Sequence, residues 1–146
     1  MALTAEYSPE LSGVFLYFDG EKTEAKPDLF AGTAASYLRE NKGKKLILLD
    51  EIGGVELLDP EFRKALYAAL EGDIPCLGVL KLETSMRNMC QNRAIDSGCV
   101  DYHLKLREDL TRRFGADIVR FERARTRDAE RILDEFIHTI FGESGV

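Results

Sequence analysis

The sequence from Lys44 to Leu70, KKLILLDEIGGVELLDPEFRKALYAAL, decides the fold of this chain. Its apolar run ends at Asp50 and Glu51 and predicts a buried strand. Two glycines follow, and Asp59 as an N-cap with Pro60 at the first helical position then predicts the start of a helix. The sequence thus predicts a strand, a turn that carries two adjacent carboxylates, and a helix that leads the chain back.

The alternation of strands and helices continues on both sides of this stretch. Apolar runs predict strands at residues 13–18, 45–50, 76–81 and 117–122. Helical spacing and glycines at the helix ends predict helices at residues 28–41, 60–71, 85–94, 101–114 and 127–141. This order is typical of a parallel sheet built by right-handed crossovers. We therefore expect an α/β fold with a three-layer, mostly parallel sheet, helices on both of its faces, and one domain over residues 1–146.

Composition and charge limit the class of protein. The chain has 146 residues, of which 45% are hydrophobic and 32% charged, and its net charge is -6. The acidic balance disfavours binding to nucleic acid or to an anionic membrane. No apolar run approaches the ~20 residues that span a bilayer, and the N-terminus lacks the features of a signal peptide, so we expect a cytoplasmic protein. Three cysteines without a CxxC pair indicate neither a disulfide framework nor a zinc ribbon.

One set of cysteine and histidine residues has a spacing that is compatible with a metal site. Cys90, Cys99 and His103 lie within fourteen residues of one another, but they lack a fourth ligand. Met86, Met89 and Cys90 follow helical spacing, which is typical of residues that fill a core. We therefore predict core packing at these positions.

Charged side chains stand at the ends of two predicted strands. Asp50 and Glu51 end the strand over 45–50, and Lys81 ends the strand over 76–81. Ligands of parallel sheets bind outside the carboxyl ends of the strands, so we expect these residues to face one crevice. There two adjacent carboxylates could hold a metal ion and a water. The alternative is that the two carboxylates only mark a solvated strand end.

The stretch carries a family resemblance. It contains DEIG at Asp50–Gly53, then Glu56 with Leu57, Phe62 near a helix start, and LGV at Leu77–Val79. This string resembles the Walker B region of P-loop nucleoside triphosphatases, and most closely the thermophile-type nucleoside-triphosphatase family. The resemblance implies an ATP- or GTP-binding domain with a magnesium ion, with Glu51 as the catalytic residue and Asp50 as the residue nearest the metal.

The phosphate-binding loop of that family has no counterpart in these residues. A P-loop reads G-x-x-x-x-G-K-[ST], and this string does not occur in the chain. The nearest candidate, FDGEKTEAKPDLF at Phe18–Phe30, has Glu21 between Gly20 and Lys22, and its helix begins too late. We therefore expect a P-loop NTPase-like fold that lacks the P-loop unit, with residues 12–24 as a remnant of the strand pair that lies between the two motifs.

The arginines gather near the C-terminus. Five of them lie within twelve residues, at Arg120, Arg123, Arg125, Arg127 and Arg131. Arg125 is our candidate for a nucleotide phosphate, because a guanidinium binds two phosphate oxygens at once. The alternative is a solvated connection whose arginines pair with neighbouring acids.

The sequence is compatible with two functions. The first is the Walker B portion of a magnesium-dependent nucleoside triphosphatase, inactive alone, whose P-loop is supplied either upstream or by a partner subunit. The second is a degenerate P-loop-like module for binding or assembly. A homodimer is expected if part of the sheet is left uncovered.

Overall fold

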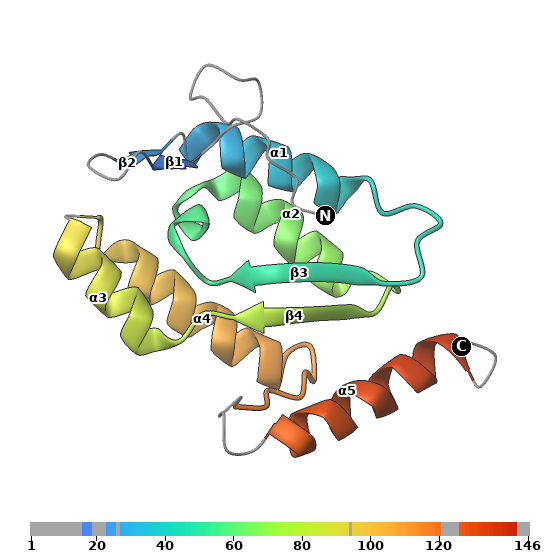
Figure 1. Cartoon of the computed structure of the whole chain (residues 1–146). Helices are drawn as coiled ribbons and strands as arrows, with labels where there is room; N and C mark the ends of the chain where they lie inside the picture. Colours follow the sequence, from blue (N-terminus) through green and yellow to red (C-terminus); the bar gives the residue numbers. More distant parts are fainter. Residues whose placement is uncertain (1–15, 19–22, 26, 94, 121–125, 143–146) are drawn as a thin grey trace, which may run out of the picture.

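The computed structural model describes residues 16–18, 23–25, 27–93, 95–120 and 126–142, in which strands alternate with helices (Figure 1). The strands are β1 (Leu16–Phe18), β2 (Thr23–Ala25), β3 (Ile47–Ile52) and β4 (Cys76–Leu80). The helices are α1 (Pro27–Arg39), the 3-10 helix η1 (Val55–Leu58), α2 (Pro60–Glu71), α3 (Glu83–Arg93), α4 (Gly98–Arg112) and α5 (Thr126–Phe141). The predicted α/β class is confirmed.

Strands β3 and β4 form a parallel pair that is joined through η1 and α2. Ile47 lies opposite Cys76, and Leu49 lies opposite Gly78. The strands approach closely at this second pair, because a Cβ on Gly78 would lie 2.8 Å from the Cβ of Leu49. The predicted strand–helix–strand crossover is therefore confirmed, and both strands end at the same edge.

The helix between these strands begins and ends where the sequence predicts. The Asp59 carboxylate accepts a hydrogen bond from the Phe62 amide at 2.8 Å, Pro60 occupies the first turn, and Gly72 follows the last residue. Helix α2 buries Phe62 and Leu66 on its inner face. The cap and the apolar stripe thus fix the start and the orientation of this helix.

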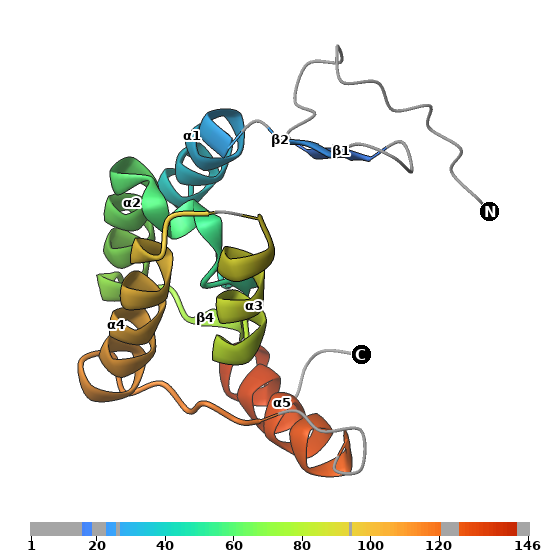
Figure 2. The ribbon, with the colours of Figure 1, turned by 90° about the vertical axis from the view of Figure 1, so that its left-hand side faces the viewer.

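One face of the strand pair carries the core. Helices α2 and α4 lie together on this side, and α1 lies beside α2 (Figure 2). The core joins alternate residues of β3 to the buried faces of the three helices, and its members include Leu38, Ile47, Leu49, Leu57, Phe62, Leu66, Leu106 and Leu110. Helix α3 packs against the start of α4 around a second, smaller cluster that contains Met86, Cys99 and Val100.

The opposite face of the strand pair is exposed among the described residues. Leu48 of β3 is 69% exposed and Val79 of β4 is 58% exposed. The described sheets have two strands each, and side chains of β3 alternate between buried and exposed positions. The predicted three-layer sheet with helices on both faces is therefore not confirmed, because an apolar strand sequence does not tell which face a helix of the same chain covers.

Of two predicted strands near the ends of the chain, the first is confirmed in part and the second is wrong in its described part. Strand β1 covers the last part of the predicted strand at 13–18, and it pairs antiparallel with β2, which is the strand pair expected at residues 12–24. The predicted strand at 117–122 is wrong over residues 117–120, which are irregular, and residues 121 and 122 lie outside the described part. Ile118 and Val119 are both exposed there, so these apolar residues do not mark a buried strand.

Helix α5 confirms the predicted helix at 127–141 to within one residue. Leu133 and Phe141 on this helix are exposed, and neither of the two core clusters contains one of its described residues. Among the described helices, none is long and apolar enough to cross a membrane.

Candidate functional site

A β-bulge at the end of β3 explains why two adjacent carboxylates are both exposed. Leu49 pairs with Gly78 and Ile52 pairs with Leu80, so β3 has one residue more than β4 between these pairs. Asp50 and Glu51 are the residues inside the bulge, and both are exposed, whereas successive residues of a regular strand face opposite sides.

The backbone of Glu51 is strained. Its φ of 49° lies in the left-handed region, and Glu51 is the non-glycine residue with positive φ in the described part of the chain. Such a conformation costs about 1–2 kcal/mol for a residue with a side chain. Strain of this kind persists where the surrounding structure fixes it, and it occurs preferentially at functional sites.

Lys81 joins the two strand ends. It follows β4 directly, its amide donates to the Ile52 carbonyl at 2.8 Å, and its ammonium group forms an ion pair with Glu51. The Lys81 side chain is 23% exposed and that of Glu51 is 54% exposed. The expected arrangement of Asp50, Glu51 and Lys81 at one edge is therefore present, whereas the fourth predicted residue, Arg125, lies outside the described residues.

The donor set at this edge fits a magnesium ion that is held mainly by a nucleotide. Mg²⁺ commonly uses one or two carboxylates together with phosphate oxygens and several waters. Asp50 offers an exposed carboxylate beside Glu51 at the strand end. Within the described ranges, no group of three or more His, Cys, Asp or Glu side chains is placed to hold a metal ion by itself.

The turn that follows the bulge is fixed by a buried glutamate. Oε1 of Glu56 accepts hydrogen bonds from the amides of Gly53 and Gly54, both at 2.8 Å. The Glu56 side chain is buried with the turn, and the space beside Gly54 is filled by its carboxylate. In the sequence, Glu56 stands out only as part of the family string, and nothing there indicates this role.

A buried histidine supports the same turn from α4. Nδ1 of His103 lies 3.0 Å from the Gly53 carbonyl, so this nitrogen carries the hydrogen and donates. His103 is 1% exposed, and a Cβ on Gly53 would lie 2.7 Å from its Nδ1. Core packing was predicted for Met86, Met89 and Cys90, and no such role was predicted for His103, whose side chain packs against the turn behind Glu51. A signal for the burial of His103 exists in the sequence, because residues 99, 103, 106 and 110 follow helical spacing, and all four are buried in the structure.

The possible metal set of Cys90, Cys99 and His103 is not supported by the positions of these side chains. His103 contacts Gly53, whereas Cys90 and Cys99 contact each other, with their sulfurs 2.7 Å apart. Both thiols are free and belong to the small core cluster beside α3.

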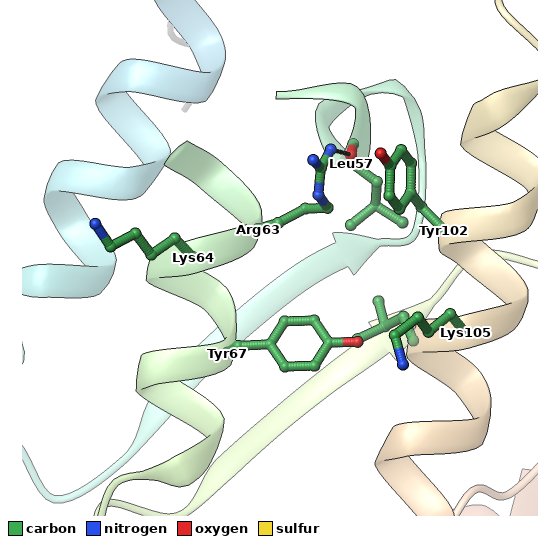
Figure 3. Close-up of a pocket in the computed structure, with 7 residues that line it drawn as sticks. Leu57, Arg63, Lys64, Tyr67, Tyr102 and Lys105 are labelled. Atoms are coloured by element: carbon green, nitrogen blue, oxygen red, sulfur yellow. Dashed lines mark hydrogen bonds between the residues drawn. The ribbon is translucent and has the colours of Figure 1, made fainter. Parts of the chain in front are cut away.

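A pocket of about 250 Å³ lies between α2 and α4 (Figure 3). The Arg63 guanidinium lies 3.8 Å from the centre of the Tyr102 ring and donates to the Leu57 carbonyl, so it ties α2 and α4 to η1. The pocket is lined by Leu57, Arg63, Lys64, Tyr67, Tyr102, Lys105 and Leu106. None of the predicted site residues is among them.

Tyr67 lines this pocket and connects α2 to α4. Its hydroxyl donates to Oδ2 of Asp109 at 2.6 Å. Burial and this hydrogen bond raise the pKa of Tyr67 above its ordinary value. The same hydrogen bond lowers the pKa of Asp109, with a further contribution from Lys105. The pair stabilises the packing of α2 against α4 and leaves Asp109 as a carboxylate at neutral pH.

The part of the chain that contains the strand ends and the pocket matches a known protein family. A family model described as NTPase matches residues 22–112 of the chain, which include β3, β4 and both helices around the pocket. No curated protein and no solved structure matches the chain.

Proposed function

The chain belongs to this NTPase family, and we propose that the edge formed by Asp50, Glu51 and Lys81 binds a magnesium-bound ATP or GTP. The observation that carries the proposal is the β-bulge. It presents two adjacent carboxylates at the carboxyl end of a parallel strand, beside a lysine from the end of the neighbouring strand. Ligands of α/β sheets bind at such edges.

Each of the three side chains would have its own role. Asp50 would hold the magnesium ion through a bound water, and the ion would neutralise charge on the β- and γ-phosphates. The Lys81 ammonium group would donate to a phosphate oxygen. Since Lys81 pairs with Glu51 in this structure, a phosphate that competes for Lys81 would release the Glu51 carboxylate to orient a water. Arg125 is proposed as a further phosphate contact.

Turnover by these residues alone is expected to be slow. The backbone amides and the lysine of a P-loop supply much of the phosphate binding in this class, and their sequence string does not occur here. A binding or assembly module is therefore the second candidate function. Phosphate release that depends on magnesium and is lost in Glu51→Gln would favour the enzyme, whereas nucleotide binding without turnover would favour the module.

The Asp50→Ala variant tests the site directly. We expect calorimetry to show that the wild-type chain binds magnesium and ATP or GTP, and that Asp50→Ala weakens this binding by roughly 10–100-fold or more. Asp59→Ala is the control, because it removes a carboxylate nine residues away that caps α2. This control should keep the affinity and lose about 1 kcal/mol of unfolding free energy. Absence of binding in the wild type, or equal affinity in Asp50→Ala, would contradict the proposal.

We also propose that the exposed face of β3 and β4 is covered in the working assembly, either by a second copy or by a P-loop-bearing subunit. Leu48 and Val79 expose apolar surface on neighbouring strands, and such surface is typical of an interaction site. Light scattering over micromolar concentrations should show association that is weakened by Leu48→Ser. A monodisperse monomer in the absence and presence of such a subunit would contradict this proposal.

A further inference from the structure

Two cysteines outside the candidate site lie unusually close together. Cys90 is in the last turn of α3 and Cys99 is in the first turn of α4, and their sulfurs are 2.7 Å apart. A disulfide requires sulfurs at ~2.05 Å, so the two atoms need only a small further approach. The two helices contact each other, and Met86 of α3 packs with Cys99 and Val100 at the start of α4. Figure 1 shows α3 in front of α4 at the same end of the molecule.

We propose that Cys90 and Cys99 form a reversible disulfide that joins α3 to α4 when the protein meets a peroxide. The proposal concerns a modification site and does not depend on nucleotide binding. Cys76 serves as an internal comparison, because its sulfur contacts the carbonyls of Ala69 and Ile74 and has no second thiol beside it among the described residues.

The two thiols differ in their access to solvent, as a reaction with one attacking and one resolving thiol requires. Cys90 is half-buried, so a small oxidant can reach it, whereas Cys99 is fully buried beside Met86 and Val100. Burial, and after it the hydrogen bond with Cys90, raises the pKa of the Cys99 thiol to about 12. Cys90 is therefore the thiol that reacts first, and Cys99 is the one that resolves the product.

The reaction balances with one peroxide. The Cys90 thiol loses its proton and the thiolate attacks a peroxide oxygen; the O–O bond breaks, Cys90 becomes a sulfenic acid, and the departing hydroxide takes up a proton equivalent to the one lost and leaves as the first water. The Cys99 sulfur then attacks the Cys90 sulfur, its proton goes to the departing hydroxyl group, and the second water leaves as the S–S bond forms. The two thiols lose two electrons together, and hydrogen peroxide is reduced to two waters.

The disulfide would fix a part of the fold that the large core does not hold. The junction of α3 and α4 rests on the small cluster around Met86, Cys99 and Val100. Helix α4 continues from Cys99 to His103 within about one turn, and His103 supports the turn behind Glu51. A covalent link at the start of α4 therefore holds the support of that turn in place.

Peptide mapping of the full chain tests the proposal without any substitution. Trypsin cleaves after Arg87, Arg93 and Lys105, so Cys90 and Cys99 fall in the separate peptides NMCQNR and AIDSGCVDYHLK. After treatment with hydrogen peroxide and alkylation of free thiols, we expect these peptides to be joined by a disulfide, with Cys76 alkylated. Dithiothreitol should release them. Linkage through Cys76, linkage between two chains, or sulfinic acid at Cys90 without any linked peptide would overturn the proposal.

Stability gives a second and independent measurement. The oxidised chain should melt roughly 5 °C or more above the reduced chain, because the bond closes a short loop in the unfolded state. Cys90→Ser should abolish this difference, whereas the matched variant Cys76→Ser should keep it. An oxidised wild type that melts at the same temperature as its reduced form, or below it, would show that the sulfurs do not reach disulfide geometry without strain.

Discussion

The residues that carry the proposed chemistry and the residues that hold them in place differ in their surroundings, although they are neighbours in the chain. Asp50 and Glu51 are exposed, and their described side-chain contact is the ion pair between Glu51 and Lys81. In the turn that follows, Gly53 and Glu56 are buried, and both Glu56 and the buried His103 of α4 form hydrogen bonds with Gly53. The bulge ends where the buried turn begins, so the strained backbone of Glu51 is held by the turn behind it.

This difference separates two kinds of substitution. Replacement in the buried turn should reduce the unfolding free energy, because it creates a clash or leaves buried amides without partners. Replacement at the exposed edge should change stability little, because exposed ion pairs contribute little. If the edge binds nucleotide, its substitutions should instead change affinity.

The largest effect is expected for Gly53→Ala. Gly53 has a φ of 95°, and a Cβ there would lie 2.7 Å from Nδ1 of His103 and 3.0 Å from a methyl carbon of Leu80. Strain and overpacking together should lower the unfolding free energy by about 3 kcal/mol or more in urea denaturation.

Gly43→Ala is the matched control for this variant. Gly43 also has a positive φ, 77°, but a Cβ there meets no atom within 4 Å. This variant should lose only about 1–2 kcal/mol, from backbone strain alone. Equal losses for the two variants would mean that His103 does not pack tightly against the turn.

A smaller effect is expected for Glu56→Ala. This substitution removes the acceptor for the amides of Gly53 and Gly54, which are buried. We expect a loss of about 2–3 kcal/mol, since each buried amide without a partner costs about 1–3 kcal/mol and water can satisfy part of the deficit. Glu108→Ala, at an exposed glutamate that pairs with Arg112, should change the unfolding free energy by less than about 0.5 kcal/mol. A Glu56→Ala variant as stable as this control would show that the turn keeps its shape without the carboxylate.

The sequence predicted the parts of this region that depend on local signals. The N-cap at Asp59 and the helix after Pro60 follow from residue types at short spacing, and the parallel crossover and the shared edge of Asp50, Glu51 and Lys81 follow from the order strand, helix, strand. The bulge could not be predicted in this way. It depends on the register between β3 and β4, which is set by contacts between residues about 30 positions apart.

The buried support of the turn was also beyond sequence reasoning. His103 lies 50 residues from Gly53, and a lone histidine on a helix gives no indication of which carbonyl it reaches. The contact between Cys90 and Cys99 was missed for a related reason: both residues fit an ordinary core pattern, and only the packing of α3 on α4 brings their sulfurs together. Apolar strand patterns likewise predicted coverage of both sheet faces, which the exposure of Leu48 does not confirm.

Among the substitutions at the turn and at the edge, Lys81→Gln is expected to change stability least and to separate the two regions most clearly. The ion pair with Glu51 is partly exposed, so its loss should change the unfolding free energy by less than about 1 kcal/mol. Loss of a charged hydrogen bond to phosphate should nevertheless weaken magnesium–nucleotide binding by roughly tenfold or more. Lys105→Gln, at a lysine that pairs with Asp109 on α4, should have an equally small effect on stability and leave the affinity unchanged. If calorimetry instead finds the same nucleotide affinity in Lys81→Gln and in Lys105→Gln, the lysine at the end of β4 only neutralises Glu51, and the phosphates bind elsewhere.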